Sequence, residues 1–350
     1  MTINNLIEAF IFNFNGKNTV LTTIESLYRS QNVKVDITVI DDHSVDDSVE
    51  LIRKTYPEVK IHVLPKNTKK LNVLRNMALN LSKGEFVLIT DNDINFNSNC
   101  LSNLLSLIKS DETIASCTPR LMHWDKPDIV YTAGTKVHFI GAAICDQRDE
   151  PFNNNITEPT SNSGGGISLL RRQAALKVGG FDDELLMGWG DDGEFYQRLL
   201  RAGYKCLYVP NAFAFHENKI VDSIRKYRVT GQTYNRWVFI LSHYSIPLII
   251  LLIPVFIMYE ILQSGFVLIK GVFPQYLLGN FFVIKNYRKI FRKRKFVQKI
   301  RTVPDKEVLF SGQLYVAPAL LKKYRWLQIF TNLFSAFLSF YWHLVKKIIR

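Results

Sequence analysis

Short apolar runs alternate with amphipathic segments through the first ninety residues, and this alternation limits the possible folds more than any other feature. The apolar runs occupy residues 7–12, 35–41, 59–64 and 85–90. The segments with helical spacing occupy residues 19–30, 44–56 and 71–84. Strands that alternate with helices through short links pair in parallel, and the helices pack on the faces of the sheet. The sequence therefore predicts an α/β fold with a doubly wound sheet.

Acidic side chains follow two of these predicted strands. Asp41 and Asp42 stand at the end of the second run, and Asp91 and Asp93 follow the fourth with only Asn92 between them. Ligands of open α/β sheets bind beyond the carboxyl ends of the strands. Two carboxylates this close repel each other unless a cation or water screens them. They indicate either a solvated turn or two oxygen ligands of Mg²⁺ or Mn²⁺ shared with a diphosphate.

Composition and charge exclude several classes of protein. The chain of 350 residues is 47% apolar, which excludes wholesale disorder, and its net charge of +13 favours a polyanionic partner. No nucleic-acid-binding motif accompanies the charge, so we expect no nucleic acid partner. The four cysteines form no CxxC pair, which disfavours a zinc module or a disulfide scaffold. No basic segment precedes the first apolar run, so we expect no secretory signal and a catalytic part in the cytoplasm.

A second pair of acids, Asp191 and Asp192, precedes a segment with helical spacing in "GWGDDGEFYQRLLRAGY". Acids at a helix N-terminus are stabilised by the helix dipole, so the pair can be a simple capping cluster. Alternatively, one carboxylate acts as a general base on a hydroxyl group. Gly188 and Gly190 would then let the backbone approach a ligand, and Trp189 would offer a flat face to a sugar ring.

Two further features each allow a structural and a functional interpretation. His216 ends the apolar run "VPNAFAF" and is either a structural histidine or a ligand. The glycines 164–166 of "GGGISLLRR" form a plain turn or make room beside a substrate. In that second case we expect Arg171 or Arg172 to face solvent.

Seven segments carry a resemblance to a known family when they are taken in order. They are "NFNG", "IDDHSVDDS", "LRN", "DND", "GGGISLLRR", "GFDDELLMGWGDDGEFYQRLLRAGY" and "VPNAFAFH". Together they resemble glycosyltransferase family 2, the inverting nucleotide-sugar transferases of the GT-A fold, over about residues 6–216. The resemblance implies a Rossmann-like GT-A domain that binds a nucleotide-sugar donor.

The resemblance also implies roles for individual residues. The residues implied to bind the nucleotide, with Asp42 reading the base, are Asn13, Asn15, Asp42, Arg75, Asp91 and Asn92. The residues implied to hold a divalent metal, Mg²⁺ or Mn²⁺, are Asp91, Asp93 and His216. The residues expected beside the acceptor are Gly165, Gly166, Trp189 and Gly190. Asp192 matches the family's catalytic base. The family usually has "ED" where this chain has Asp191 and Asp192, so Asp191 is the second candidate.

These roles imply an inverting, metal-dependent glycosyltransferase. Asp192 would deprotonate an acceptor hydroxyl, which attacks the anomeric carbon opposite the departing nucleoside diphosphate. A nucleotidyltransferase is the nearest enzymatic alternative, since it would share the acids at the strand ends. A non-catalytic nucleotide-sugar-binding or scaffold protein is the alternative from another class, although such a protein would be expected to lose these acids. Rhamnose, galactose and glucose donors all remain open.

The sequence after about residue 236 changes character. Trp237–Tyr259 contains no charged Asp, Glu, Lys or Arg, Glu260 interrupts the apolar run, and nine Lys or Arg residues lie between Lys285 and Arg301 without an acid. We therefore expect a GT-A catalytic domain over 1–235 and membrane-associated helices over 236–350. The helices would be re-entrant, paired in a hairpin or interfacial, on the cytoplasmic face of an anionic membrane. A buried helical subdomain is the alternative.

The same region favours a non-processive enzyme. "GQTYNRW" misses the QxxRW signature of processive polysaccharide synthases by one residue, and the chain lacks their channel-forming bundle. We expect a transferase that adds one sugar to a lipid-linked or envelope glycan acceptor during surface polysaccharide biosynthesis.

Overall fold

The predicted strands belong to one mixed sheet of ten strands in the computed structural model, which describes residues 5–153, 157–188, 190–217, 226–314 and 325–349. The chain divides into two compact units. The first unit comprises Met1–Gly134, Asp146–Asp183 and Tyr204–Val221. The second unit comprises Thr135–Cys145, Glu184–Gly203 and Asp222–Arg350. The predicted boundary at 235/236 separates a catalytic part from a membrane-associated part. It therefore describes functions of the two parts and stays a prediction.

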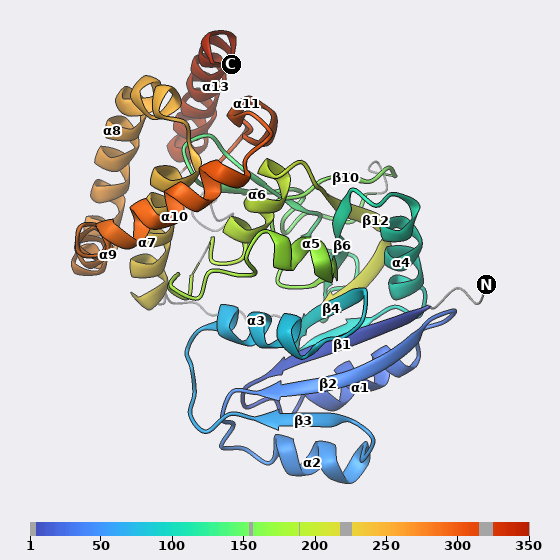
Figure 1. Cartoon of the computed structure of the whole chain (residues 1–350). Coiled ribbons are helices and arrows are strands. Elements are labelled where there is room, and N and C mark those ends of the chain that lie inside the picture. Colours follow the sequence, from blue (N-terminus) through green and yellow to red (C-terminus); the bar gives the residue numbers. More distant parts are fainter. Residues whose placement is uncertain (1–4, 154–156, 189, 218–225, 315–324, 350) are drawn as a thin grey trace. The chain divides into compact units, whose positions relative to one another are not determined.

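The sheet lies in the first unit. Its strands are β1 (Leu6–Asn13), β2 (Lys34–Asp41), β3 (Lys60–Val63), β4 (Phe86–Asp91), β5 (Ile94–Phe96), β6 (Ile114–His123), β7 (Val130–Thr132), β10 (Thr160–Ser161), β11 (Ser168–Arg171) and β12 (Lys205–His216). The order along the sheet is β10-β12-β6-β11-β4-β1-β2-β3, with β5 paired to β12 and β7 paired to β6. The blue arrows in Figure 1 show β1, β2 and β3 side by side.

The parallel pairing predicted for the first four strands is confirmed. β1 pairs in parallel with both β2 and β4, and β2 pairs in parallel with β3. The remainder of the sheet departs from a purely parallel arrangement, because β11 lies antiparallel between β4 and β6.

Helices cover this sheet. They are α1 (Val20–Tyr28), α2 (Ser48–Thr55), α3 (Leu71–Leu81), α4 (Cys100–Ser110) and α5 (Arg172–Lys177). α3 packs against β1 and β4, α1 packs against β2 and β5, and α4 packs against β6 and β12. The core consists of branched side chains from the central strands and apolar residues from α1 and α4. Because β1 and β4 are largely buried on both faces, their sequences are mostly apolar, as is typical of parallel central strands.

The second unit is mainly helical. Its helices are α6 (Gly193–Arg201), α7 (Lys226–His243), α8 (Ile246–Ile269), α9 (Phe273–Lys285), α10 (Tyr287–Ile300), α11 (Asp305–Val308) and α13 (Arg325–Ile348). A hairpin of β8 (Thr135–Val137) and β9 (Ala143–Cys145) accompanies them. α7 packs against α9 and α10, and a small core of Leu185, Tyr234, Val238 and Ile290 forms around α7 and α10.

The apolar stretch Trp237–Tyr259 is divided between two helices. α7 ends at His243, and α8 begins at Ile246 after the N-cap Ser245, whose hydroxyl accepts a hydrogen bond from the amide of Leu248. Pro247 in the first turn suits a helix start, because its missing N–H would have no helical partner there. Ser245 and Pro247 therefore mark a helix boundary.

Glu260, which interrupts the apolar run of the sequence, does not interrupt the helix. Glu260 lies inside α8, where the Arg236 guanidinium and the Tyr276 hydroxyl both donate hydrogen bonds to its carboxylate. Arg236 also donates to the carbonyl of Ile140 at 2.8 Å. These partners from α7 and α9 offset the cost of placing a carboxylate in an apolar helix.

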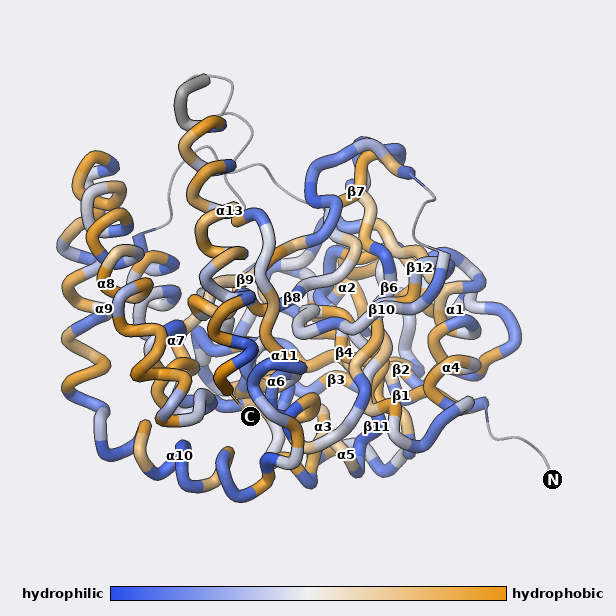
Figure 2. The backbone as a smooth tube through the Cα atoms, turned by 90° about the horizontal axis from the view of Figure 1, so that it is seen from above, coloured by the Kyte–Doolittle hydropathy of each residue, from blue (hydrophilic) through white to orange (hydrophobic). Residues whose placement is uncertain are grey.

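Of the described helices, α8 alone is long and apolar enough to cross a bilayer. Its most apolar window has a mean hydropathy of 2.2, and 22% of that window is buried inside the protein. A core helix of a soluble protein would be mostly buried. Figure 2 shows the largely hydrophobic colour of α8, which contrasts with the alternation of hydrophilic and hydrophobic positions along α10.

Candidate active site

Three neighbouring strands of the first unit end at the same edge of the sheet with polar side chains. Asn13 of β1 pairs with Asp41 of β2, and Phe12 pairs with Asp91 of β4. The backbone amide of Asp42 donates to the carbonyl of Asn13 at 2.8 Å. Residues that are up to about eighty positions apart in the sequence therefore meet where the strand–helix pattern predicts a site.

Asp91, Asp93 and His216 are brought together at this edge. One ligand atom from each lies within 4.8 Å of the other two. Strand β5 directly follows Asp93 in the sequence and pairs with β12. His216 of β12 lies opposite Ile94 and therefore lies close to the two acids. The His216 Nε2 atom lies 3.5 Å from Asp93 Oδ1.

The chemistry of these three groups fits a divalent metal. Burial lowers the pKa of His216, against the opposing effect of Asp91, so the imidazole is neutral at physiological pH and keeps a lone pair for a cation. Two carboxylates and one imidazole form a ligand set that suits Mn²⁺ well and Mg²⁺ through its oxygens. A single ion between the Asp91 and Asp93 carboxylates would also offset the electrostatic repulsion between them.

The surroundings of His216 contain residues that the sequence analysis missed. The Tyr131 ring packs on the His216 ring with a centroid distance of 4.6 Å, and the Arg148 guanidinium lies 4.6 Å from the centroid of the same tyrosine. The amide of Trp124 donates to the carbonyl of His216 at 3.0 Å. These contacts orient the imidazole, but no local motif in the sequence links the four residues.

The side chains of Asn13 and Asn92 are joined by a hydrogen bond. The Asn92 Nδ2 atom donates to Asn13 Oδ1 at 2.7 Å, and the Asn13 Nδ2 atom donates to Asp41 Oδ2 at 2.7 Å. Asn13 is 1% exposed and also contacts the hydroxyls of Ser44 and Ser48. This buried network ties the end of β1 to the "DND" turn.

Gly16 makes this network possible. A Cβ atom at Gly16 would lie 2.1 Å from Asn92 Nδ2 and 2.3 Å from Asn13 Oδ1. We expect Gly16→Ala to break the Asn13–Asn92 hydrogen bond and to destabilise the fold by about 1–3 kcal/mol. Chemical denaturation measures the loss. The matched control is Gly265→Ala in α8, where a Cβ would meet nothing within 4 Å. Equal stability of the two variants would contradict this account.

Asp42 is held by Thr68, which the sequence analysis also missed. The Thr68 amide donates to Asp42 Oδ1 at 2.8 Å, and the Thr68 hydroxyl donates to Asp42 Oδ2 at 3.1 Å. Asn15 adopts a positive φ of 52°, and its Oδ1 accepts a hydrogen bond from the amide of Val45 at 2.9 Å. Asn15 therefore shapes the loop next to Asp42, and the conformation explains an asparagine there.

Arg75 and Gly166 lie next to the acids. A Cβ atom at Gly166 would lie 3.5 Å from Asp91 Oδ2 and 3.7 Å from Arg75 Nη2, so the glycine backbone adjoins both charges. The Arg75 Nη1 atom donates to Asn72 Oδ1 at 2.7 Å, and the guanidinium lies 5.4 Å from the centroid of the Phe181 ring. Gly166, predicted near the acceptor, thus lies beside residues predicted to bind the donor.

Gly165 also belongs to the first unit, where a Cβ atom would lie 2.9 Å from Thr118 Cγ2, and the second unit carries Gly190, Asp191 and Asp192. Asp192 is the N-cap of α6, as predicted, and its side chain accepts a hydrogen bond from the Gly193 amide at 2.8 Å. Asp191 precedes it, and Gly190 has a φ of 88°, which favours glycine. Trp189 lies outside the described residues.

One interpretation of the sequence had Arg171 or Arg172 facing solvent. The structure instead shows both guanidinium groups hydrogen-bonded to other parts of the protein. Arg171 donates to the carbonyl of Ile108 at 2.6 Å and to Glu85 at 2.7 Å, and Arg172 donates to the carbonyl of Leu79 at 2.9 Å. Their guanidinium groups anchor β11 and α5 to neighbouring elements. A basic residue at a strand end can satisfy several carbonyls at once, which the sequence pattern does not reveal.

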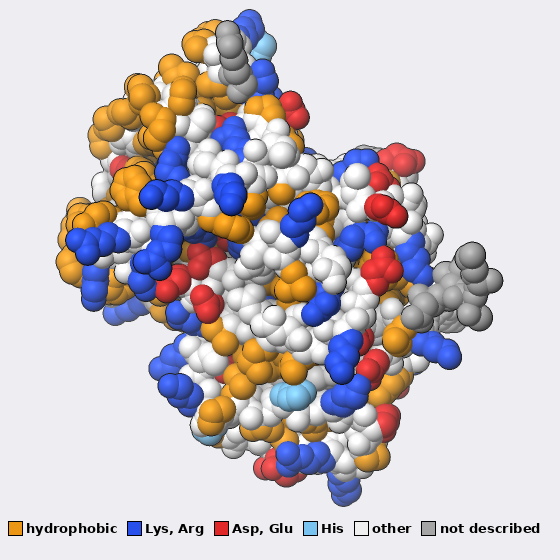
Figure 3. All heavy atoms as spheres, in the orientation of Figure 1, with side chains coloured by type: hydrophobic (Ala, Val, Ile, Leu, Met, Phe, Trp, Pro, Cys, Tyr) orange, Lys and Arg blue, Asp and Glu red, His pale blue; other side chains and the backbone are white. Residues whose placement is uncertain are grey.

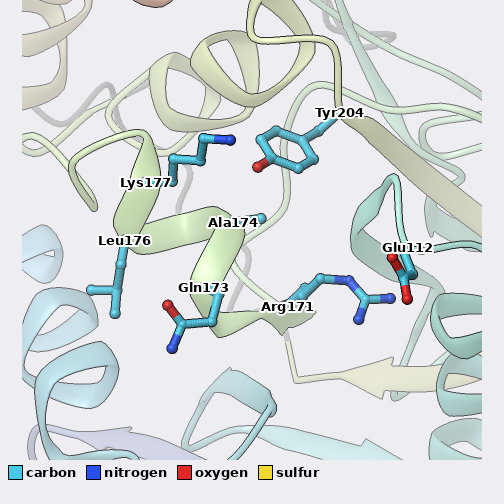
Figure 4. Close-up of a pocket in the computed structure, with 7 residues that line it drawn as sticks. All are labelled: Glu112, Arg171, Gln173, Ala174, Leu176, Lys177 and Tyr204. Atoms are coloured by element: carbon cyan, nitrogen blue, oxygen red, sulfur yellow. The ribbon is translucent and has the colours of Figure 1, made fainter.

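A surface depression of the first unit lies beside Arg171 and contains none of the predicted site residues. Its lining residues are Glu112, Arg171, Gln173, Ala174, Leu176, Lys177 and Tyr204. Figure 4 shows Lys177 and Tyr204 on one side of the opening and Arg171 extending towards Glu112 on the other. The Arg171 bonds described above show that its charge is already engaged by the protein.

Comparison with known proteins identifies two family matches. Residues 9–179 match glycosyl transferase family 2, and residues 153–221 match a family described as the N-terminal domain of galactosyltransferase. An Escherichia coli UDP-Glc:alpha-D-GlcNAc-diphosphoundecaprenol beta-1,3-glucosyltransferase is 26% identical over 111 residues, which are 32% of this chain and 44% of that protein. The O-antigen chain rhamnosyltransferase of Salmonella anatum is 23% identical over 215 residues, which are 60% of this chain and 66% of that protein.

The fold of this chain is similar to that of a solved structure. The crystal structure of GalNAc-T7 with UDP, GalNAc and Mn²⁺ superposes with a TM-score of 0.57 at 17% identity, over 70% of this chain and 49% of that one. The chain thus spans less than two thirds of the length of each of these three proteins. The structural similarity supports the GT-A fold predicted from the sequence.

Proposed function

Because residues 9–179 belong to glycosyl transferase family 2, we propose that this glycosyltransferase moves a sugar from a nucleoside-diphosphate sugar to a hydroxyl group of a glycan acceptor. The observation that carries the proposal is the cluster of Asp91, Asp93 and His216 at the strand ends of that domain. Arg75 and Asp91 both lie beside Gly166. The Arg75 guanidinium provides a positive charge for the donor diphosphate.

The names of two relatives support a proposal for the acceptor and the pathway. One similar enzyme is named for a sugar diphosphate on undecaprenol, and another is named for the O-antigen chain. We propose that this chain likewise extends a lipid-linked glycan in surface polysaccharide biosynthesis, at the cytoplasmic face of the membrane. The choice among rhamnose, galactose and glucose as the donor sugar is left to experiment.

Asp91, Asp93 and His216 would hold the divalent metal. The similar GalNAc-T7 structure contains Mn²⁺ together with UDP, which supports a metal in this fold. A bound Mg²⁺ or Mn²⁺ would supply positive charge that stabilises the leaving diphosphate. Asp42, Asn15 and Asn13, at the ends of β1 and β2, form the side of the site where the nucleoside would lie.

The reaction needs one base and one leaving group. Asp192, whose carboxylate caps α6, accepts the proton of the acceptor hydroxyl, and the freed oxygen attacks the anomeric carbon. The bond between that carbon and the diphosphate oxygen breaks, Arg75 compensates charge on the departing nucleoside diphosphate, and the anomeric centre is inverted. A Cβ atom at Gly190 would meet only Asn235 Cβ, at 4.0 Å, among the described residues, so we expect a sugar to approach the base there.

Product identity tests the proposed function. Purified protein is incubated with UDP-, dTDP- and GDP-sugars, Mn²⁺ and a detergent extract of lipid-linked glycans, and the products are separated by chromatography. We expect a nucleoside diphosphate and a glycan one sugar longer. Release of pyrophosphate or a nucleoside monophosphate would instead identify a nucleotidyltransferase. Binding of a donor without turnover over the whole acceptor set would favour the scaffold alternative.

We further propose that the second unit binds an anionic membrane surface. α8 exposes a stripe formed by Ile246, Ile250, Ile253, Ile257 and Ile261. α13 exposes a similar stripe formed by Ile329, Leu333, Phe337, Phe340 and Leu344. Figure 3 shows hydrophobic side chains gathered over α8 and α9, with Lys and Arg side chains beside them. Apolar stripes next to basic residues are typical of helices at a membrane interface.

Helix α10 supplies the charge for this interaction. Arg288, Arg292, Lys295 and Lys299 are exposed and recur at helical spacing along it. We expect replacement of Arg292, Lys295 and Lys299 by glutamine to weaken binding to vesicles rich in anionic lipid about a hundredfold, since each basic residue contributes about 1 kcal/mol. Vesicle sedimentation measures the affinity.

A matched triple variant in the first unit is the control for the vesicle experiment. Lys54, Lys66 and Lys83 are also exposed, and their replacement by glutamine changes the net charge by the same amount. We expect this variant to retain the affinity of the native protein. An equal loss in both triple variants would contradict a specific role of α10.

A further inference from the structure

The first turn of α6 contains a buried acid, Glu194, that the proposed reaction does not use. Its side chain is 1% exposed, and Arg198 donates to both carboxylate oxygens at 2.8 Å. Lys293 of α10 lies 3.0 Å from the carboxylate, and His243 of α7 lies 3.1 Å from it. Groups from three helices of the second unit therefore converge on one carboxylate.

The charges of this cluster are tightly balanced. Although burial opposes ionisation, Arg198 and Lys293 hold the pKa of Glu194 well below its usual range, so the group is an anion. Burial lowers the pKa of His243 to about 4, so this histidine is neutral at physiological pH. One anion thus faces the buried Arg198 and the partly buried Lys293, and its removal would take a counter-charge away from both.

The other end of α6 is held in a comparable way. Arg201 donates to Asp305 Oδ1 at 2.6 Å, and Asp305 also accepts from the Ser245 amide at 3.0 Å and pairs with Arg301 at 3.1 Å. α6 is therefore fixed by a buried ion pair at each end. Only the Glu194 end carries the proposed catalytic base.

We propose that Glu194 is a positioning residue for Asp192, an inference that rests on the proposed function. The two residues are two positions apart at the start of one helix, with Glu194 buried and Asp192 partly exposed. The contacts of Glu194 with α7 and α10 fix where α6 begins, and the helix start fixes the direction of the Asp192 carboxylate. A shift of about 1 Å in a catalytic group is enough to lower a rate about a hundredfold.

Glu194→Gln tests this inference, with Asp305→Asn as the matched control at the opposite end of α6. Both variants keep the size of the side chain and remove one buried anion. We expect Glu194→Gln to lower kcat tenfold to a hundredfold with a donor KM within twofold of the native value. We expect Asp305→Asn to lose comparable thermal stability and to keep kcat within threefold. Equal losses of kcat in both variants, or a kcat of Glu194→Gln within twofold of the native value, would overturn the inference.

Lys293→Met serves if Glu194→Gln does not fold. This variant keeps the Glu194–Arg198 pair and removes the ion pair between Glu194 and Lys293 of α10, and we expect kcat to fall severalfold at unchanged donor KM. An unchanged kcat would overturn the inference. The native enzyme measured in the same assay separates the two hypotheses. If the native protein transfers no sugar, the proposed function fails, whereas native turnover with an unaffected Glu194→Gln rejects only the positioning role.

Discussion

Replacement of Asp192 by asparagine is expected to lower the rate of sugar transfer about 10²–10⁴-fold and to leave donor affinity unchanged. The acceptor hydroxyl is a weak nucleophile until a base removes its proton, and an amide cannot accept that proton. Asparagine is as good an N-cap as aspartate, so the start of α6 is retained and the fold is unaffected. Initial rates with saturating donor and acceptor, together with a thermal melt, measure both parts of the expectation.

Asp191→Asn is the control for this experiment. The two acids are adjacent, and family 2 enzymes usually have "ED" at these positions, so the sequence alone leaves both as candidates. We expect Asp191→Asn to retain most of the activity. A larger loss in Asp191→Asn than in Asp192→Asn would reassign the base to Asp191, and full activity in both variants would remove general base catalysis from the second unit.

Replacement of Asp93 by alanine is expected to abolish binding of the divalent metal and to lower transfer about 10³-fold. Asp93 is one of three groups whose ligand atoms lie within 4.8 Å of one another, so its loss leaves two ligands for the ion. Titration calorimetry with Mn²⁺, with and without UDP, measures the binding separately from activity.

Asp36→Ala is the matched control for the metal experiment. Asp36 also belongs to the first unit, but it forms a surface ion pair with Lys60 at 2.6 Å in the middle of β2. An exposed pair of this kind contributes about 0–1 kcal/mol to stability, so we expect native metal affinity and activity. Retention of Mn²⁺ binding in Asp93→Ala would contradict the assignment of the metal ligands.

The first part of the fold was predictable because its signals are local. Each of the first four strands is an apolar run, each link contains a helical pattern, and the acids follow the strands directly, so the sheet edge with Asp42, Asp91 and Asp93 could be placed from the sequence. The antiparallel β11 was not predicted, since its position between β4 and β6 depends on long-range pairing.

The supporting residues of the site could not be predicted for the same reason. Thr68 reaches Asp42 across a loop, and Tyr131 reaches His216 from a different strand. Two of the partners of Glu194, His243 and Lys293, come from α7 and α10, so the sequence around Glu194 does not reveal this cluster. Gly16 was visible in "NFNG", but only the distances to the Asn13 and Asn92 side chains explain why a glycine is needed.

The apolar C-terminal region illustrates how a pattern can indicate helices without indicating where each helix begins and ends. Its helices were predicted, yet the division between α7 and α8 at Ser245 and the inclusion of Glu260 in α8 were not. An N-cap followed by proline indicates a helix start even inside an apolar run. A carboxylate inside an apolar helix is tolerated when, as with Arg236 and Tyr276, partners from neighbouring helices donate to it.

Release of a nucleoside diphosphate from a nucleotide sugar is the measurement that tests the central claim most directly. The native protein, Asp93→Ala and Asp36→Ala are each incubated with UDP-, dTDP- and GDP-sugars in Mn²⁺, in a chelator, and in a chelator followed by excess Mn²⁺. The account predicts that the native protein and Asp36→Ala release the diphosphate from one donor, that the chelator stops this release, and that added Mn²⁺ restores it. Undiminished release by Asp93→Ala, or no release or binding of any donor by the native protein, would contradict it.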